Sequence, residues 1–372
     1  MTAEIVIGLG YGDEGKGITT DYLCNRKRGN SIVIRFSGGQ QAGHTVMLDD
    51  IKHIHSNFGS GTLRGVPTYF SEHTTFYPVT LMRELKILQD KGLDPELVLH
   101  PLAKMTTPWD VFANRNCEYN KSHGTCGLGV GKTMKRNEGP VKLNAIDLLD
   151  MDILRDKVQQ VRKWYKAETD GDPELTKEVS DFVDAIMDMD VEIADYTHLL
   201  NYSNLIFEGS QGILLDMDFG VFPYVTYANT TSKNAMEILD FLEVQDRHVY
   251  YVTRAYSTRH GDGPFQERPL KLKNNEEEIN VYNKWQKGLK VAPISYTKLD
   301  YAIQADKVYS SYYQHSLVVT CLDQVPKKTF DARMIKSHFD YVLESHSPYS
   351  KDFKVNNMNE QKSKEKLAKE YI

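Results

Sequence analysis

Two carboxylates stand inside a glycine-rich stretch near the start of the chain, where such groups are unusual. Asp13 and Glu14 lie within the segment Gly10 to Lys16, which fits the P-loop pattern G-x-x-x-x-G-K of phosphate-binding proteins. The next residue is Gly17, so the hydroxyl that normally holds Mg²⁺ in this loop is missing. A carboxylate repels a neighbouring phosphate unless it binds a metal ion or transfers a proton. The stretch therefore predicts phosphate binding combined with metal or proton-transfer chemistry.

The residues on either side of this loop predict the elements that hold it. Ile5-Val6-Ile7 is typical of a short buried strand, and we expect a helix to begin near Lys16, with its free amides facing a bound anion. Strand-like runs alternate with helical ones farther along, and helices are expected over residues 79–91, 150–166 and 174–194. This alternation predicts an α/β fold with a P-loop-NTPase-like, mostly parallel central sheet flanked by helices. Because no strong linker interrupts the chain, we expect one elaborated domain over residues 1–355 and a polar tail over residues 356–372.

The composition argues against several classes of protein. The 372 residues are 40% hydrophobic and carry a net charge of -6, which provides no basic surface for nucleic acid. Cys24, Cys117, Cys126 and Cys321 are scattered without a C-x-x-C pair, which argues against a structural zinc site or a disulfide framework. No apolar run is long enough to span a membrane, and the first residues do not resemble an export signal. The sequence therefore predicts a cytoplasmic protein that binds neither nucleic acid nor membrane.

Two further glycine-rich loops could reach the same ligand. The loop Gly38 to Thr45 follows a strand expected over residues 31–36, and its His44 could donate a proton or a hydrogen bond to a phosphoryl group. A surface turn with a structural histidine is the alternative. The loop over residues 124–132 could wrap a phosphate, although a mobile surface loop explains it equally well. Because ligands bind at the carboxyl ends of the strands in open α/β sheets, we expect such loops to converge there.

Three histidines outside these loops have simpler interpretations. His260 lies near Asp262 in a run of glycines, and a glycine-stabilised turn is a better interpretation there than a catalytic pair. His53 and His55 alternate along a possible strand, and the sequence shows no third metal ligand beside them. We therefore expect both to be structural or exposed.

Five motifs, taken in order, resemble those of the adenylosuccinate synthetase family. They are GDEGKG at residues 12–17, AGHT at 42–45, EGSQGILLD at 208–216, PYVTYANTT at 223–231 and AYSTRHGDGPF at 255–265. The similarity covers roughly residues 4–325, and the order of five motifs argues strongly against a chance match. The chain resembles the compact form found in archaea and in some bacterial viruses.

The resemblance implies a homodimeric, two-step ligase that uses Mg²⁺. GTP would phosphorylate O6 of IMP, and the amine of L-aspartate would then displace that phosphate at C6. Because O6 is a poor nucleophile while N1 carries a proton, the reaction needs a base at N1. By resemblance this base is Asp13, which would also bind Mg²⁺ together with Gly43. His44 resembles the residue that stabilises the transferred phosphoryl group, and Gln211 resembles the glutamine beside the 6-phosphoryl group.

The resemblance also implies which residues hold each substrate. The expected phosphate contacts of the nucleotide donor are Gly12, Glu14, Gly15, Lys16, Gly17, Gly43 and Thr45. The expected contacts of the purine monophosphate are Gln41, Thr125, Cys126, Arg136, Gln211, Thr226 and Arg259, with Arg136 as the arginine that reaches across the dimer interface.

The contacts of the donor base and of aspartate are less regular. Asp323 is expected to hold the donor base, although Cys321 stands where the family has lysine, and Thr297-Lys298-Leu299-Asp300 is a competing match. The arginine-rich loop that binds aspartate in the family is absent. Lys287 and Lys290 are expected to serve instead, with Arg254 or Arg259 as the alternative.

These departures leave the substrate open. A viral branch of the family condenses aspartate with dGMP, making a precursor of 2-aminoadenine DNA, and GTP, ATP or dATP could be its donor. Many members of that branch replace the loop aspartate by a small hydroxyl residue, so Asp13 favours IMP, whereas Gln41 replaces the usual asparagine beside O6. A P-loop nucleotide switch is the alternative of another class, and Gly17 disfavours it because a switch GTPase needs a hydroxyl there.

Overall fold

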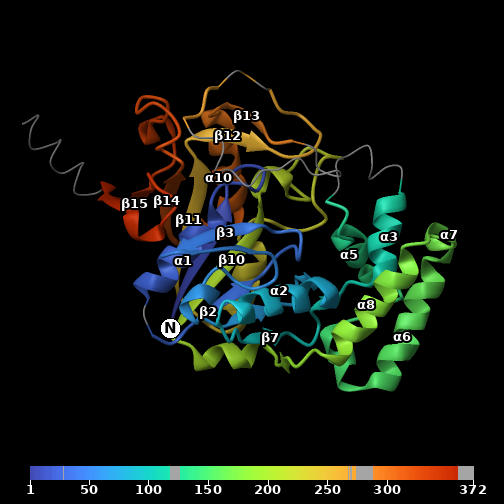
Figure 1. Cartoon of the computed structure of the whole chain (residues 1–372). Helices are drawn as coiled ribbons and strands as arrows, with labels where there is room; N and C mark the ends of the chain where they lie inside the picture. The colour runs from blue at the N-terminus through green and yellow to red at the C-terminus, as the bar shows by residue number, and fades with distance from the viewer. Residues whose placement is uncertain (28, 118–125, 267, 269, 274–287, 359–372) are drawn as a thin grey trace, which may run out of the picture.

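A ten-stranded sheet runs through the molecule, with β1 near its middle (Figure 1). The computed structural model describes residues 1–27, 29–117, 126–266, 268, 270–273 and 288–358. The strand order of the ten-stranded sheet is β16-β15-β14-β11-β1-β10-β2-β5-β7-β9. Neighbouring strands are parallel throughout, except that β16 is antiparallel to β15. The predicted α/β fold with a mostly parallel central sheet is confirmed.

The bounds of the elements follow the alternation in the sequence. The strands of the large sheet are β1 (Thr2–Gly8), β2 (Ser31–Arg35), β5 (Thr68–Phe70), β7 (Leu97–Leu99), β9 (Glu192–Ile193), β10 (Asn204–Gly212), β11 (Asp246–Arg254), β14 (Gln314–Thr320), β15 (Tyr341–Glu344) and β16 (Lys354–Asn357). Three small sheets pair β3 (His44–Leu48) with β4 (Ile51–His55), β6 (Thr75–Phe76) with β8 (Lys104–Met105), and β12 (Tyr256–Arg259) with β13 (Lys290–Pro293). The helices are α1 (Lys16–Arg26), α2 (Pro78–Asp90), α3 (Pro108–Asn116), α5 (Val130–Glu138), α6 (Met151–Trp164), α7 (Lys166–Thr169), α8 (Leu175–Met187), α9 (Lys233–Phe241) and α10 (Tyr296–Ser310).

Two boundaries differ from the sequence-based expectation. The helix expected over residues 174–194 ends at Met187, and Glu192–Ile193 instead pairs with β7 as the edge strand β9. Asn356 and Asn357, which were expected to begin the polar tail, pair with β15 as part of β16. In both cases pairing with a distant strand decides the conformation, and local sequence carries little information about such pairing.

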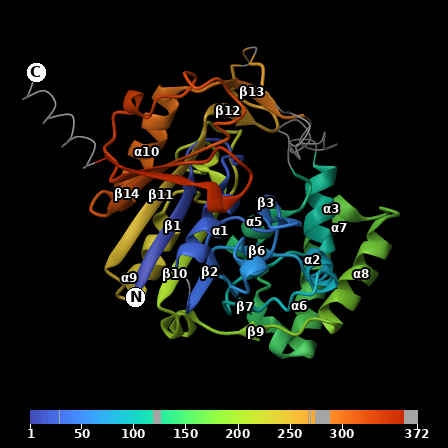
Figure 2. The same cartoon turned by 60° about the vertical axis from the view of Figure 1, so that its left-hand side comes forward.

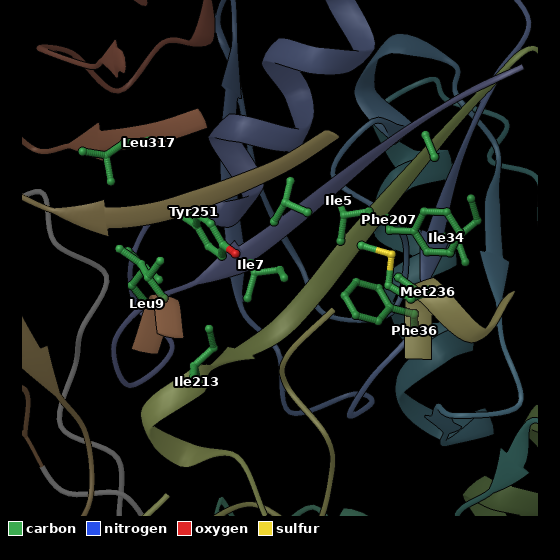
Figure 3. Packing of buried hydrophobic residues seen from close by; sticks show 14 of the residues in the cluster. Ile5, Ile7, Leu9, Ile34, Phe36, Phe207, Ile213, Met236, Tyr251 and Leu317 are labelled. Atoms are coloured by element: carbon green, nitrogen blue, oxygen red, sulfur yellow. The ribbon is translucent and has the colours of Figure 1, made fainter. Parts of the chain in front are cut away.

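The sheet has a buried cluster on each face because side chains alternate along a strand. Ile5 and Ile7 of β1 point into one cluster, which also contains Leu239 of α9 and Ile303 of α10; Figure 3 shows its central part. Val6, between them, packs on the other face with Leu23 of α1 and other residues. The central strands are therefore covered by helices on both faces.

A third cluster lies beyond the β7 side of the sheet. Figures 1 and 2 show α3, α6 and α8 gathered there, on the side away from β14 and β15. Its buried residues include Leu88 of α2, Phe112 of α3, Val161 of α6 and Phe182 of α8.

No helix among the described residues is both long and apolar enough to cross a bilayer.

The carboxyl ends of the central strands supply the polar loops. The loop Leu9 to Gly15 follows β1, residues 36–43 follow β2, and Thr320 ends β14. Gln211 lies at the end of β10 and Arg254 at the end of β11. Because these strands are parallel neighbours, their ends meet at one edge of the sheet.

Candidate functional site

The first glycine-rich loop folds around its own carboxylate. Oε1 of Glu14 accepts hydrogen bonds from the amides of Gly10 at 3.0 Å and Gly12 at 2.7 Å, and Oε2 lies 2.9 Å from Nζ of Lys16. Glu14 and Lys16 are 4% and 1% exposed. A Cβ at Gly8 would lie 2.2 Å from Oε2 of Glu14, so glycine is needed there to make room for the carboxylate. The Glu14 carboxylate is therefore an internal anion of the loop, bound by the loop's own amides and by Lys16.

The missing hydroxyl of the P-loop pattern has a steric reason. Helix α1 begins at Lys16 as predicted, after Gly15 in the left-handed region with φ of 94°. A Cβ at Gly17 would lie 2.7 Å from Cβ of His44 and 3.1 Å from Oγ of Ser60. Serine or threonine cannot occupy position 17 without moving His44. The first turn of α1 is therefore shaped to receive the second glycine-rich loop.

Asp13 is held at the edge of this loop by cationic groups. Its Oδ2 lies 2.8 Å from Nδ1 of His260, and Nε of Arg254 donates to its backbone oxygen. Burial alone would raise the pKa of the Asp13 carboxyl, but the hydrogen bond and charge of His260, with Arg254 and Lys16, lower it below its ordinary value. The side chain is 26% exposed. The carboxylate is thus ionised at neutral pH and reachable. His260 precedes a glycine-rich turn, as expected, with Gly261 and Gly263 at positive φ, and it also contacts Asp13.

His44 forms a buried pair with Glu208. Its Nδ1 lies 2.7 Å from Oε1 of Glu208, and the same carboxylate accepts from the amide of Ser60 at 3.0 Å and from the Ser60 hydroxyl. Burial lowers the pKa of the His44 imidazole. The Glu208 carboxylate acts to raise this pKa, and the Arg35 guanidinium acts to lower it further. Burial acts to raise the pKa of Glu208, but His44, Arg35 and Ser60 together lower it to about 2. Glu208 therefore stays ionised and fixes the ring, so that Nε2 of His44 faces away from it.

Several buried polar groups on β2, β10 and the second glycine-rich loop have no partner among the described residues. They are Nε2 of His44, Oε1 of Gln211, both amide atoms of Gln41, and Nε and Nη1 of Arg35. The two glutamine amides lie together, because a Cβ at Gly38 would be 2.7 Å from Nε2 of Gln41 and 2.8 Å from Oε1 of Gln211. Buried polar groups are normally satisfied, so a cluster of unsatisfied ones indicates a polar ligand.

A second, cationic side of the site borders the first loop. Nζ of Lys298 donates to the hydroxyl of Tyr11 at 3.1 Å, and the Arg259 guanidinium lies 4.4 Å from the centre of the Tyr11 ring. Arg254 and Lys298 line one groove with the loop, together with hydroxyl residues such as Ser257. Arg259 is buried, and its guanidinium donates to the backbone oxygens of residues 262 and 264. Arg254 and Lys298 are therefore the cations that face this groove, while Arg259 supports it.

The end of β14 lies against the same loop. The Thr320 hydroxyl donates to the backbone oxygen of Glu14 at 2.7 Å, and Cys321 turns the chain with φ of 57°. Asp323 follows in this turn, half-buried, and accepts from the side chain of Gln324. The competing Asp300 lies within α10, where it accepts the amide of Lys336 at 2.9 Å. Asp323 therefore lies three residues after the threonine that contacts the loop, whereas Asp300 is bonded to another segment.

The structure does not bring every expected residue to this site. Arg136 is 1% exposed in α5, where it forms a two-pronged ion pair with Asp110 and donates to the backbone oxygens of Met105 and Val141. Such a buried side chain cannot reach across a subunit interface, which corrects that expectation. Thr125 and Lys287 lie outside the described residues.

The remaining expected residues are placed as follows. Nζ of Lys290 lies 3.9 Å from Asp262, Thr226 is half-buried with its amide bonded to Leu215, and Cys126 is half-buried at the start of the chain leading to α5. Gly43 is exposed before β3, and Thr45 follows His44 within β3.

The sequence did not reveal Glu208 as the partner of His44 or His260 as the partner of Asp13. Glu208 was noted only as part of a matched motif, and nothing in the sequence pairs it with His44, 164 residues away. His260 is separated from Asp13 by 247 residues. A carboxylate at the end of an apolar strand was the available signal for Glu208, since such a buried charge requires a partner.

The central parallel sheet, the glycine-rich loop leading into α1 and the unsatisfied polar cluster define an α/β protein with a modified P-loop and a polar ligand site at the carboxyl edge. Comparison with known proteins is more specific. The sequence model of the adenylosuccinate synthetase family matches residues 5–286. The chain belongs to the adenylosuccinate synthetase family.

Curated relatives agree with this assignment. The chain is 30% identical over 296 residues to adenylosuccinate synthetase of Psychromonas ingrahamii, a match that covers 75% of this chain and 66% of the relative. It is 34% identical over 277 residues to that of Hydrogenovibrio crunogenus, covering 70% and 62%. The chain thus spans slightly less than two thirds of the length of these curated relatives.

Two solved structures share the fold over nearly the whole chain. One is the fully ligated adenylosuccinate synthetase of Plasmodium falciparum, with a TM-score of 0.69 at 21% identity, covering 95% of this chain and 87% of that one. The other is the succinoaminodeoxyadenylate synthetase of cyanophage S-2L bound to dGMP and dATP, with a TM-score of 0.66 at 15% identity, covering 95% of both chains.

Proposed function

We propose that the chain is a ligase that joins L-aspartate to C6 of a 6-oxopurine nucleoside monophosphate, through a 6-phosphoryl intermediate formed from GTP. The observation that carries this proposal is the set of buried, unsatisfied polar atoms of His44, Gln41 and Gln211, which lie on the loops and strand ends next to the loop of Asp13. An oxopurine edge and a phosphoryl group supply the donors and acceptors that such a cluster lacks. IMP is the proposed substrate, and dGMP is the alternative, because the phage neighbour was solved with dGMP.

Asp13 is the proposed base for the first step. The N1–H of the purine would donate to its carboxylate, and transfer of that proton leaves negative charge on O6, which then attacks the γ-phosphorus of the donor. His260 and Arg254 keep the carboxylate ionised before the substrate arrives, because both favour its charged form. They also position it, since one contacts its side chain and the other its backbone oxygen.

His44 is the proposed donor to the phosphoryl group in transfer. With Nδ1–H directed at Glu208, the neutral ring presents an Nε2 lone pair, so it must gain a proton to donate there. An approaching phosphate dianion favours that proton, and Glu208 stabilises the resulting imidazolium. Gln211 and Gln41 would satisfy the remaining oxygens of the phosphoryl group and the purine.

The start of α1 is the proposed seat of the donor phosphates. The amides of the first turn and the dipole of this eleven-residue helix favour an anion. The Lys16 ammonium, which contacts Glu14 and the oxygen of Gly12, is the nearest full positive charge. Glu14 balances that charge, so Lys16 would share its hydrogen bonds between the loop carboxylate and a phosphate.

Mg²⁺, which the family implies, fits the donor atoms present. The partly exposed Asp13 carboxylate and the exposed backbone at Gly43 offer hard oxygen ligands, and Mg²⁺ typically adds phosphate oxygens and water to one or two carboxylates. When bound, the ion neutralises charge on the transferred phosphoryl group.

The cationic groove is the proposed site for L-aspartate. Arg254 and Lys298 line it beside the loop, and two carboxylates need two cations. This assignment favours Arg254 over Lys290 as the second cation, because Lys290 lies toward Asp262.

Asp323 is proposed to hold the donor base, since its carboxylate can accept from both N1–H and the amino group of guanine. We also propose that the enzyme is a cytoplasmic homodimer.

A product assay tests the proposal. IMP, dIMP, GMP and dGMP are each offered with GTP, ATP or dATP, with and without L-aspartate, and both phosphate release and the succinylated nucleotide are measured. Phosphate release that needs the monophosphate and aspartate together supports the ligase and identifies its substrates. Slow hydrolysis that is indifferent to aspartate would favour the nucleotide switch instead.

A further inference from the structure

A cluster of metal-ligand side chains lies one strand behind His44. His53 and His55 are on β4, and Glu84 is on α2. One nitrogen of each histidine and one oxygen of the carboxylate lie within 4.8 Å of one another, and all three residues are buried. Alternate residues of a strand share a face, so His53 and His55 both point inward, whereas Ile54 between them is 40% exposed.

His55 is the unusual member of the cluster. It is fully buried, and neither ring nitrogen has a hydrogen-bond partner among the described residues. Its ring centre lies 4.6 Å from that of His53 in an edge-on arrangement. A buried imidazole without partners forfeits the hydrogen bonds that it would make in water, which is costly unless another ligand takes a nitrogen lone pair.

Glu84 is oriented as a carboxylate ligand would be. It accepts from the amide of Asn57 at 2.7 Å and from the side-chain amide of Asn57 at 2.9 Å, both through Oε2. Its Oε1 lies 3.3 Å from Nε2 of His53 and also accepts from the amide of Ser56. These bonds fix the carboxylate between α2 and the end of β4, with Oε1 toward the histidines.

We propose that His53, His55 and Glu84 bind a divalent transition-metal ion of the Zn²⁺ class. Two imidazoles and one carboxylate form a donor set that Zn²⁺ accepts, and three protein ligands leave one tetrahedral position for water. Lys91 donates to Nδ1 of His53 at 3.0 Å, so the proton of that ring is on Nε2, facing Glu84. Ligation through Nε2 releases this proton to solvent, and the ion takes its place between His53 and Glu84.

Lys91 opposes binding and provides a sharp test. A ligated ring carries its proton on Nδ1, where it would face the Lys91 ammonium, so Lys91 must turn away. Lys91 is partly exposed and also donates to the backbone oxygen of Lys52 at 2.8 Å, so the side chain can move without leaving a buried charge. Lys91→Met removes the repulsion and is expected to tighten Zn²⁺ binding about tenfold.

The ion would join β4 to α2 and thereby stabilise the β3–β4 hairpin, which carries His44. His55 lies directly opposite His44 in the antiparallel register of β3 and β4. This inference does not depend on the proposed ligase activity, because the cluster contains none of the residues assigned to the reaction. Bound Zn²⁺ is therefore expected to raise the melting temperature by a few degrees, by favouring the folded state.

Metal content and affinity of the full-length chain test the proposal. Protein stripped with a chelator is titrated with Zn²⁺ against a chromogenic competitor in buffer containing excess Mg²⁺, and zinc is measured after desalting. The expected result is one equivalent bound with a Kd below about 1 µM, loss of at least 100-fold in affinity for His55→Asn, and tighter binding for Lys91→Met.

His346→Asn is the matched control, because His346 also lies beside a glutamate, at 3.7 Å from Glu344, but in an exposed pair. It is expected to bind zinc as the wild type does. Thermal unfolding in chelator shows whether His55→Asn is folded, and Lys91→Met tests the site without altering a ligand. Absence of a retained equivalent in the wild type, or unchanged affinity in both His55→Asn and Lys91→Met, would overturn the proposal.

Discussion

Replacing Glu208 by glutamine is the most direct test of how the proposed reaction uses His44. The change preserves the shape of the side chain and removes only its charge, which lies 2.7 Å from Nδ1 of His44. The imidazolium that would donate to the phosphoryl group loses its counter-ion, while the neighbouring Arg35 continues to disfavour it. Phosphoryl transfer should therefore slow, although nucleotide binding at α1 should not change.

The expected magnitude follows from the geometry. Two unit charges with centres about 4 Å apart interact by about 4 kcal/mol at an effective dielectric constant near 20. Because each 1.36 kcal/mol is a factor of ten in rate, complete loss of this interaction corresponds to roughly 10³-fold in kcat. An ordinary general acid or base contributes about 10²- to 10⁴-fold, so the two estimates agree. We expect kcat for Glu208→Gln to fall by 10²- to 10³-fold, with KM for the purine monophosphate changed by less than about threefold.

The assay follows phosphate release with saturating aspartate at several pH values. A lower pKa for His44 makes its proton harder to retain, so the alkaline limb of the kcat profile should move to lower pH in Glu208→Gln. Ser60→Ala is the control, because it removes a hydroxyl that donates to Glu208 and leaves the charge in place. It should cost less than about tenfold, since one neutral hydrogen bond is worth about 1 kcal/mol. Activity of Glu208→Gln within threefold of the wild type, with an unmoved pH profile, would refute the assigned role of the pair.

Three other predictions follow from the same site. Asp13→Ala should nearly abolish turnover and leave nucleotide affinity within a few fold, which equilibrium binding and kcat measure separately; full activity would exclude Asp13 as the base. Lys298→Met should raise KM for aspartate by about tenfold or more and leave KM for the monophosphate unchanged, because one cation is lost from the groove; equal effects on both would contradict the assignment. Because the pKa of Glu208 is lowered to about 2 in the folded chain from 4.5, its stabilising contribution is complete above about pH 4.5 and is lost as the pH falls. The melting-temperature advantage of the wild type over Glu208→Gln should therefore shrink as the pH falls from about 4.5 toward 2, and a constant difference would contradict it.

The P-loop-like stretch shows how far local sequence reaches. The strand before it, the helix beginning at Lys16 and the alternation of strands and helices were predictable, because periodicity and glycine placement are properties of neighbouring residues. Family motifs also predicted that Asp13, His44 and Gln211 would matter. The role of Glu14 was not predictable, since its carboxylate could face outward to a metal or inward to the loop amides, and only the folded loop selects the second.

The sequence by itself determined the α/β class, the glycine-rich, P-loop-like start of the chain and its family, because each is encoded by residues adjacent along the chain. The tertiary structure decided what each charged group meets. It placed Glu208 against His44 and His260 against Asp13, enclosed Arg136 with Asp110, and brought Glu84 to His53 and His55. Such pairings depend on strand order and helix packing between segments as much as 247 residues apart, and burial makes a partner obligatory without specifying which one it is.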